Sequence, residues 1–183
     1  ITNIINAIKR PHWSLQTLIN GQPSFEILKP YMPKNLNISQ LAKFMDGTFS
    51  GRLNEDKIKK IRDLWKGKLV LKGAESIHDV EKAYQLGLDG VIVSNHGGRQ
   101  VDVGQATIDS LKTIAPLDKD KFTVMMDSGI RGGADVARVM ASGADFSFMG
   151  RTFMYGVSAL GRKGGNHTIA MLKTQLTQVM EQM

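Results

Sequence analysis

Short apolar runs alternate with amphipathic segments over the last two thirds of the chain. The runs at residues 69–71, 91–93, 124–126 and 146–149 predict four buried strands. Between and after them, apolar side chains recur at helical spacing over residues 77–86, 106–115, 134–141 and 168 to about 180. Ser76 stands where it can cap the first of these helices, and Gly87 follows its end. The alternation is typical of a parallel sheet covered by helices.

The first 65 residues follow a different pattern. They consist of helical fragments interrupted by four prolines, at positions 11, 23, 30 and 33. Residues 35–53 show no sustained period, which predicts a long loop. Helical spacing returns over residues 55–65. We therefore expect the chain to divide near Lys66, with loop and helices in residues 1–65 and the strand–helix units in residues 66–183.

An internal sequence repeat supports the prediction of repeated strand–helix units. Gly73, Asp79, Gly87 and Asp89 recur 56 positions later as Gly129, Asp135, Gly143 and Asp145. Four strand–helix units are half of an eight-unit barrel. A small open α/β domain is the alternative, because a half-barrel leaves two edge strands unpaired.

Composition narrows the function classes. The chain of 183 residues suits one domain and has no Cys, which excludes disulfides, thiolate metal sites and a Cys nucleophile. We single out no metal-ligand set. No apolar run approaches about 18 residues, and the start does not resemble a signal peptide. The net charge is +7, but Lys and Arg are dispersed, so nucleic-acid binding is not expected.

The segment after the second strand carries the clearest chemistry. Residues 94–100 read Ser-Asn-His-Gly-Gly-Arg-Gln, and they place His96 and Arg99 on one turn. The two glycines between them allow a sharp turn and a close approach to a ligand. A base beside an anion clamp is what proton or hydride removal from a small acid requires.

The other strand ends complete a charged rim. Lys72 ends the first strand and Asp127 ends the third. Residues 128–133 and 149–151 each combine glycine with arginine before a helix, so backbone N–H groups and two guanidiniums could hold a phosphate. If these are the last four strands of a barrel, this is the usual phosphate site after strands 7 and 8.

Four of these motifs, in this order, resemble one family. Lys72-Gly73, residues 94–100, residues 127–131 and Gly150-Arg151 are similar to the FMN-dependent L-2-hydroxy-acid oxidases and dehydrogenases. That family includes L-lactate dehydrogenase, glycolate oxidase, mandelate dehydrogenase and flavocytochrome b2. The resemblance is strong over about residues 55–175 and looser over the first 50. Residues 10–13 and 63–67 look most like bacterial L-lactate dehydrogenases.

The resemblance implies a role for each motif residue. His96 would take the proton from the substrate hydroxyl while hydride passes to flavin N5, and Arg99 would hold the substrate carboxylate. Lys72 would stabilise negative charge on the reduced flavin. The implied FMN contacts are Lys72, Ser94, Asp127, Gly129, Arg131, Gly150 and Arg151. The implied reaction is oxidation of an L-2-hydroxy acid, foremost L-lactate to pyruvate.

The resemblance also implies a (β/α)8 TIM barrel of which this chain covers strands 5–8. Residues 1–65 would be the loop and helices between barrel strands 4 and 5, and residues 66–183 the C-terminal half of the FMN-binding barrel. The piece alone is expected to be inactive. A homo-oligomer is expected, in the cytoplasm or on the inner membrane surface, with a quinone, a cytochrome or oxygen as electron acceptor.

Other interpretations remain open at this stage. One is a different FMN- or phosphate-binding barrel, such as a relative of inosine-monophosphate dehydrogenase, although the lack of Cys argues against that enzyme. Another is a non-enzymatic half-barrel that dimerises or binds phosphate. Ser94 and Asp127 could be ordinary caps at strand ends, and Lys72 could be a structural charge paired with a carboxylate.

Overall fold

The computed structural model describes residues 2–21, 25–34, 36–48, 53–116 and 122–183. The chain separates into two compact units, Ile1–Arg52 and Leu53–Met183. This boundary lies earlier than Lys66, because helix α4 (Glu55–Leu64) belongs with the second unit. The assignment of residues 1–65 to a connection between barrel strands 4 and 5 stays a prediction.

The first unit is made of short helices. These are α1 (Thr2–Ile8), α2 (Pro11–Asn20), the 3-10 helix η1 (Glu26–Tyr31) and α3 (Ile38–Thr48). Helix α1 packs against α2, and the Ser14 hydroxyl donates a 2.7 Å hydrogen bond to the Ala7 carbonyl between them. Among the residues of this unit whose exposure is described, none is buried. Its described residues therefore form no hydrophobic core of their own.

Helix α3 corrects the prediction of a long loop over residues 35–53. The helix is set by a reciprocal cap: Gln40 N–H donates to Asn37 Oδ1, and Asn37 N–H donates to Gln40 Oε1, both at 2.9 Å. Such a polar capping box leaves no trace in the apolar period that guided the prediction. Residues 35 and 49–52 of the predicted loop lie outside the described residues.

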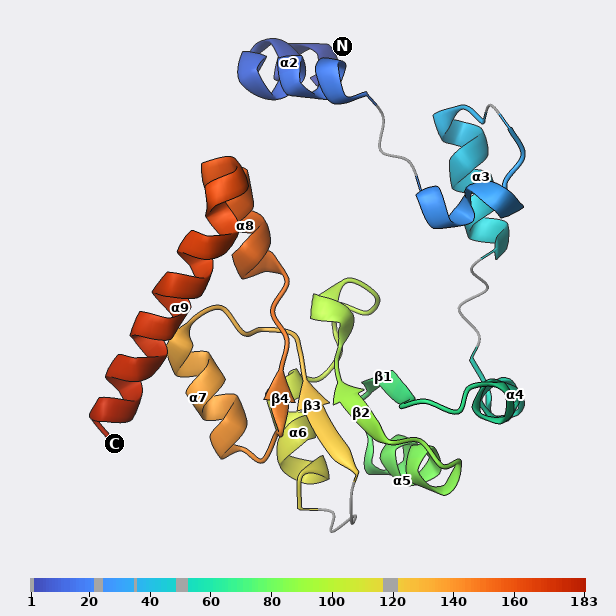
Figure 1. Cartoon of the computed structure of the whole chain (residues 1–183), viewed down its shortest axis with the longest axis vertical. Helices are drawn as coiled ribbons and strands as arrows, with labels where there is room; N and C mark the ends of the chain where they lie inside the picture. Colours follow the sequence, from blue (N-terminus) through green and yellow to red (C-terminus); the bar gives the residue numbers. More distant parts are fainter. Residues whose placement is uncertain (1, 22–24, 35, 49–52, 117–121) are drawn as a thin grey trace. The chain divides into compact units, whose positions relative to one another are not determined.

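The second unit contains the sheet. Its remaining elements are β1 (Val70–Ala74), α5 (Ile77–Gln85), β2 (Gly90–Val93), η2 (His96–Gly98), α6 (Thr107–Ile114), β3 (Thr123–Met126), α7 (Gly133–Ala141), β4 (Phe146–Ser147), α8 (Arg151–Leu160), η3 (Gly161–Lys163) and α9 (Gly164–Glu181). The strands form one parallel sheet in the order β1-β2-β3-β4 (Figure 1). The predicted alternation and half-barrel are thus confirmed, although β4 is shorter and α9 begins earlier than predicted.

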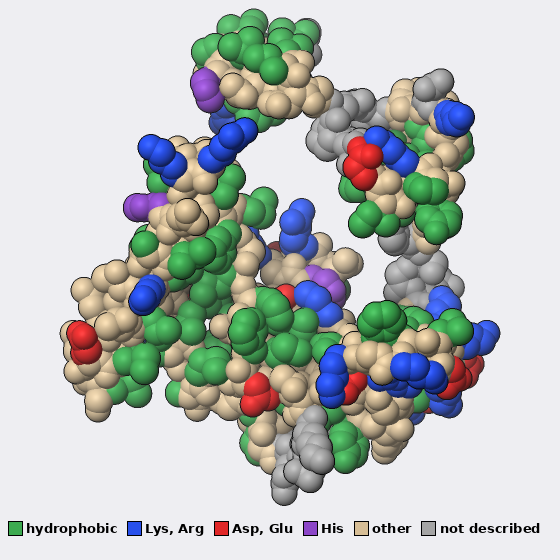
Figure 2. Space-filling model, viewed as in Figure 1, with side chains coloured by type: hydrophobic (Ala, Val, Ile, Leu, Met, Phe, Trp, Pro, Cys, Tyr) green, Lys and Arg blue, Asp and Glu red, His purple; other side chains and the backbone are tan. Residues whose placement is uncertain are grey.

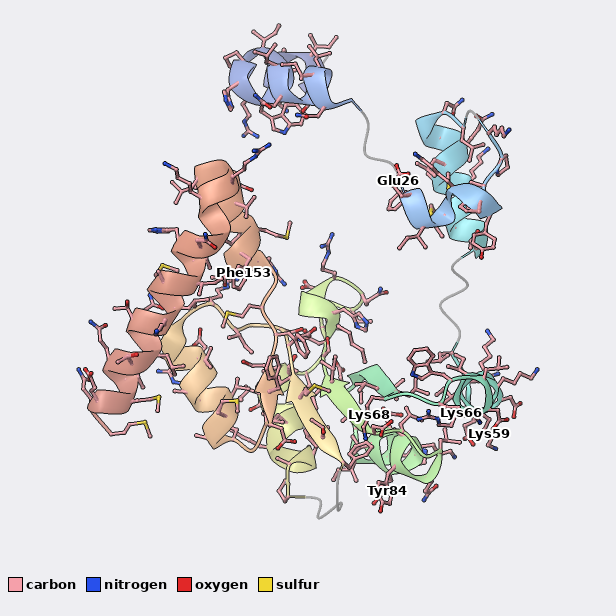
Figure 3. All side chains as sticks on the ribbon, in the orientation of Figure 1. Glu26, Lys59, Lys66, Lys68, Tyr84 and Phe153 are labelled. Carbon is pink, nitrogen blue, oxygen red and sulfur yellow. The ribbon has the colours of Figure 1, made fainter. Side chains whose placement is uncertain are left out.

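The core lies between one face of the sheet and its helices. Val91, Val93, Val124 and Met126 point to this side and are buried. They meet apolar residues of α5, α6 and α7, namely Val80, Ala83, Leu111, Ile114 and Val139. Tyr84, labelled in Figure 3, meets the ring of Phe122 edge-on with centroids 5.7 Å apart.

The opposite face of the sheet has no such cover among the described residues. Lys72, Ile92, Met125 and Phe146 stand in register across the four strands. Phe146 is exposed, and its ring packs edge-on against that of Phe148. In a closed barrel this face lines the interior, where side chains of eight strands interdigitate.

Two residues of the internal sequence repeat, Asp89 and Asp145, make the same pair of hydrogen bonds, here called a clamp. Asp89, just before β2, accepts the Leu69 N–H on its side chain at 2.9 Å and donates its own N–H to the Leu69 carbonyl. Asp145, just before β4, makes the same pair of bonds with Val124. Lys68 (labelled in Figure 3) and Arg62 also pair with Asp89, which ties α4 to the sheet. Hydrogen bonds from Lys68 and then from the Leu69 N–H lower the pKa of Asp89 to about 2.

Helices α8 and α9 form a tight pair after the sheet. A Cβ on Gly164 would collide with the backbone of Gly156, so only glycine permits this approach. The Thr168 hydroxyl is buried at the crossing and donates to the Gly164 carbonyl at 2.8 Å. Within the described ranges, no helix is both long and apolar enough to cross a membrane.

Candidate active site

The carboxyl ends of the four strands surround a depression of about 450 Å³. It is lined by eight of the nine predicted site residues: Lys72, His96, Arg99, Asp127, Gly129, Arg131, Gly150 and Arg151. Since parallel strands end at one edge of the sheet, residues up to 79 positions apart come together there. The ninth residue, Ser94, is buried and does not line the depression, but its hydroxyl accepts hydrogen bonds from Lys72 and from the His96 N–H. Its contact with FMN stays a prediction.

Lys72, Ser94 and Asp127 form a network across three strands. Lys72 Nζ lies 2.9 Å from Asp127 Oδ2 and donates a 2.9 Å hydrogen bond to Ser94 Oγ. Burial raises the pKa of Asp127, but hydrogen bonds from Ser94, Lys72 and Ser128 outweigh it and leave the pKa lowered. The carboxylate is therefore ionised, and the ammonium is held at the mouth of the half-barrel.

His96 stands on a turn that needs an unusual backbone. Its φ is 56°, in the left-handed region that non-glycine residues seldom adopt. The Asn95 side chain accepts the N–H groups of Gly97 and Gly98, and Ser94 Oγ accepts the His96 N–H at 3.1 Å. These bonds hold the strained turn, and backbone strain of this kind is concentrated at functional sites.

Gly73 makes room for the His96 ring. Strand β1 has an irregular register between Lys72 and Ala74, and Gly73 there has a φ of 97°. A Cβ on Gly73 would lie 2.8 Å from His96 Cε1. The motif Lys72-Gly73 therefore supplies both a charge and the space beside the imidazole.

Ser128 is a site residue that the sequence analysis missed. Its Oγ donates to Asp127 Oδ1 at 2.8 Å and accepts the Gly97 N–H at 2.9 Å, and its φ of 76° is also left-handed. It thus joins the end of β3 to the His96 turn. The sequence did carry a signal for it: Ser128 opens a glycine-rich loop, in which a positive φ is normally adopted by glycine.

The two glycine–arginine loops fit a phosphate. A Cβ on Gly129 or Gly150 would meet nothing within 4 Å, so the space above both is open. Arg131 and Arg151 line the same depression, and the first N–H groups of α8 have no partner within the helix. Asp135 accepts the N–H groups of Arg131 and Gly132, which fixes the first loop.

The charges that line the depression favour an anionic ligand. Four Lys and Arg side chains line the depression against a single carboxylate, that of Asp127. Arg151 also donates a hydrogen bond to the Gly97 carbonyl, which joins the second glycine–arginine loop to the His96 turn. Arg99 is exposed beside His96 on the rim. A ligand with a phosphate and a second anionic group fits this arrangement, and FMN with a carboxylate substrate is such a combination.

Sequence comparison agrees with this chemistry. The family described as FMN-dependent dehydrogenase matches residues 1–183. An L-lactate dehydrogenase of Bartonella quintana is 35% identical over 181 residues, and one of Haemophilus influenzae is 31% identical over 181 residues. These alignments cover 98% of this chain but 47% and 48% of those proteins. The chain therefore spans about half the length of the curated relatives that it matches.

Solved structures give the same result. The monotopic membrane protein (S)-mandelate dehydrogenase matches 98% of this chain and 47% of its own, with a TM-score of 0.88 and 30% identity. Flavocytochrome b2 with benzoylformate matches 70% of this chain and 34% of its own, with a TM-score of 0.67 and 36% identity. The fold, the basic rim at the strand ends and the family match converge, and the chain belongs to the FMN-dependent dehydrogenase family, whose cofactor is FMN.

Proposed function

We propose that the complete protein containing this chain oxidises L-lactate to pyruvate, with this chain supplying the base, the anion clamp and the phosphate loops. The observation that carries the proposal is the pairing of His96 and Arg99 on one turn over a basic depression. The lactate dehydrogenases similar to this chain support the choice of substrate.

Each residue has a physical role in the proposed reaction. Arg99 binds the substrate carboxylate by a charge-assisted pair. An imidazole nitrogen of His96 accepts the hydroxyl proton as the carbinol carbon is oxidised. When bound, FMN supplies the acceptor for the two electrons that leave the substrate. Lys72, held by Asp127 and Ser94, places a positive charge where negative charge develops.

The phosphate loops orient the cofactor in this proposal. Arg131 and Arg151 neutralise the phosphate, and the N–H groups at the start of α8 face it. Asp127 accepts hydrogen bonds from hydroxyl groups of the ribityl chain.

We also propose that the protein works at a membrane surface as a homo-oligomer. The similarity to a monotopic membrane protein over 98% of this chain supports the membrane location.

Rapid mixing of the purified, FMN-loaded complete protein with substrate tests the reaction. Without oxygen, L-lactate should bleach the flavin absorbance within one turnover, whereas D-lactate should not. Faster bleaching by (S)-mandelate than by L-lactate would move the substrate to an aromatic hydroxy acid. No bleaching by any 2-hydroxy acid would overturn the proposal.

A further inference from the structure

The peptide unit of Gly97, directly after His96, is held at both ends from outside its own turn. Its N–H donates a 2.9 Å hydrogen bond to Ser128 Oγ, and its carbonyl accepts a hydrogen bond from Arg151. Ser128 and Arg151 belong to the two glycine–arginine loops, 31 and 54 positions from Gly97 in the chain. Figure 2 shows Lys, Arg and His side chains together over this part of the strand ends. The position of the His96 turn therefore depends on these two loops.

Hydrogen bonds within the turn cannot replace this connection. Asn95 Oδ1 accepts the N–H groups of both Gly97 and Gly98, at 3.0 and 3.3 Å. Since Asn95 belongs to the turn, these bonds fix the shape of the turn but not its place over the sheet. Ser128 follows β3, so its hydrogen bond joins the turn to a different strand. Loss of the Ser128 hydroxyl should thus leave the turn formed but shift it over the sheet.

The hydroxyl of Ser128 is oriented by the carboxylate beside it. A hydroxyl has one proton to donate, and Ser128 donates it to Asp127 Oδ1 at 2.8 Å. The lone pairs of Oγ are left to accept the Gly97 N–H. Asp127 Oδ2 is in turn 2.9 Å from Lys72 Nζ. A continuous chain of polar contacts therefore runs from Lys72 through Asp127 and Ser128 to the peptide that follows His96.

The backbone of Ser128 gives an independent reason to assign a role to its side chain. Among the described residues, only His96 and Ser128 combine a positive φ with a side chain, and the φ of Ser128 is 76°. Glycine adopts this conformation without a steric cost, whereas serine does not. Strain of this kind persists where the surrounding structure holds it for a function. The position therefore requires the hydroxyl rather than the backbone freedom of glycine.

We propose that Ser128 is a positioning residue, whose hydroxyl ties the His96 turn to the Asp127 carboxylate and so sets where the base stands. The inference rests on the proposed function, in which His96 accepts the substrate's hydroxyl proton, and it adds a residue that acts on the reaction through His96. Because Asp127 is also the proposed acceptor of ribityl hydroxyls, cofactor binding and the position of the base share one carboxylate.

Ser128→Gly in the complete, FMN-loaded protein tests the proposal, because glycine adopts the same φ and lacks the hydroxyl. Flavin content should stay stoichiometric. The rate of flavin reduction at saturating L-lactate should fall roughly tenfold, because a misplaced base accepts the proton less well.

The matched control is Ser76→Gly. The Ser76 hydroxyl also donates to an aspartate, Asp79 Oδ2 at 2.8 Å, and accepts the N–H of that residue at 3.2 Å. It caps α5 and does not line the depression. The flavin of this variant should be reduced at the parental rate.

Two further measurements separate positioning from a general structural role. In a His96→Gln background, Ser128→Gly should have little further effect on flavin reduction, because the group that Ser128 positions is absent. Hydrogen exchange followed by mass spectrometry is independent of activity. The segment 95–99 should exchange faster in Ser128→Gly than in the parent or in Ser76→Gly, with or without FMN.

A parental rate of flavin reduction in Ser128→Gly would overturn the proposal. Loss of FMN from this variant, or an equal loss of rate in the His96→Gln background, would also overturn it, because Ser128 would then act on the cofactor rather than on the base. If no 2-hydroxy acid reduces the flavin of the parent, the proposed function fails, and hydrogen exchange alone decides whether Ser128 positions the turn.

Discussion

Lys72 on β1 and Asp127 at the end of β3 form an ion pair that crosses the strand between them, with Nζ and Oδ2 2.9 Å apart. Ser94, at the end of that middle strand, accepts a hydrogen bond from the same ammonium. The position of the Lys72 ammonium is therefore set by side chains at the ends of two neighbouring strands. A substitution at Asp127 should accordingly alter the contacts of both Lys72 and Ser94.

Replacement of Asp127 should show this coupling through pH. The pKa of Asp127 is lowered in the folded chain because hydrogen bonds from Ser94, Lys72 and Ser128 outweigh its burial. A carboxyl group with a lowered folded pKa stabilises the fold above its ordinary pKa of about 3.9 and loses that effect as pH falls through the folded value. Asp127→Asn should therefore lower the urea midpoint most near neutral pH. A loss that stays constant down to about pH 3 would contradict the assignment.

Replacement of the proposed base should separate binding from chemistry. His96→Gln in the complete protein should keep stoichiometric FMN but lower the rate of flavin reduction by L-lactate at least about a hundredfold, because no group then accepts the hydroxyl proton. Stopped-flow absorbance measures this rate. Near-parental reduction by the variant would show that His96 is not the base.

Replacement of the proposed clamp should act on the substrate alone. Arg99→Met removes a charge-assisted pair worth about 1.5–3 kcal/mol, which should weaken kcat/KM for L-lactate roughly tenfold to a hundredfold. Flavin content should stay normal, since Arg99 lies beside His96 rather than on the glycine–arginine loops. Unchanged kcat and KM would rule out the clamp.

The two loop arginines should anchor the cofactor. Neither Arg131 nor Arg151 belongs to the buried core, so replacement of both by Ala should release FMN while the unfolding midpoint of the apoprotein stays close to that of the parent. Arg162→Ala is a matched control, because Arg162 is exposed on η3 and does not line the depression. Full flavin content in Arg131→Ala/Arg151→Ala would refute the anchor.

Gly73 should be required for the position of His96. A Cβ at Gly73 would lie 2.8 Å from His96 Cε1, and the positive φ adds a backbone cost of about 1–2 kcal/mol. Gly73→Ala should thus lose turnover as well as stability. Gly161→Ala carries a positive φ but meets nothing within 4 Å, so it should lose stability alone. Equal turnover in these two variants would remove the steric role of Gly73.

The sequence predicted the sheet and the gathering of the site well, for a physical reason. Parallel strands with short helical connections bring their ends to one edge, so strand order alone places Lys72, His96 and Asp127 together. Contacts that depend on side-chain reach could not be predicted in this way. The hydrogen bond from Arg151 to Gly97 joins residues 54 positions apart, and no local pattern signals it.

The first unit shows a second limit of prediction from apolar periodicity. Helix α3 depends on the reciprocal cap between Asn37 and Gln40, which is a local polar feature rather than an apolar period. The aliphatic residues of α1 and α2 follow a helical period, but periodicity does not tell a side that faces a core from a side that is exposed. Only the absence of buried neighbours in the described part of the unit makes that distinction.

The paired clamps at Asp89 and Asp145 have a consequence for how the sheet assembles. Each clamp fixes a strand against residues only about twenty positions earlier in the chain. The clamps thus set the register of β2 against β1 and of β4 against β3 by contacts that are local in the chain. Contacts about twenty positions apart close shorter loops than more distant pairings do, so these two strand pairs can form before the sheet is complete.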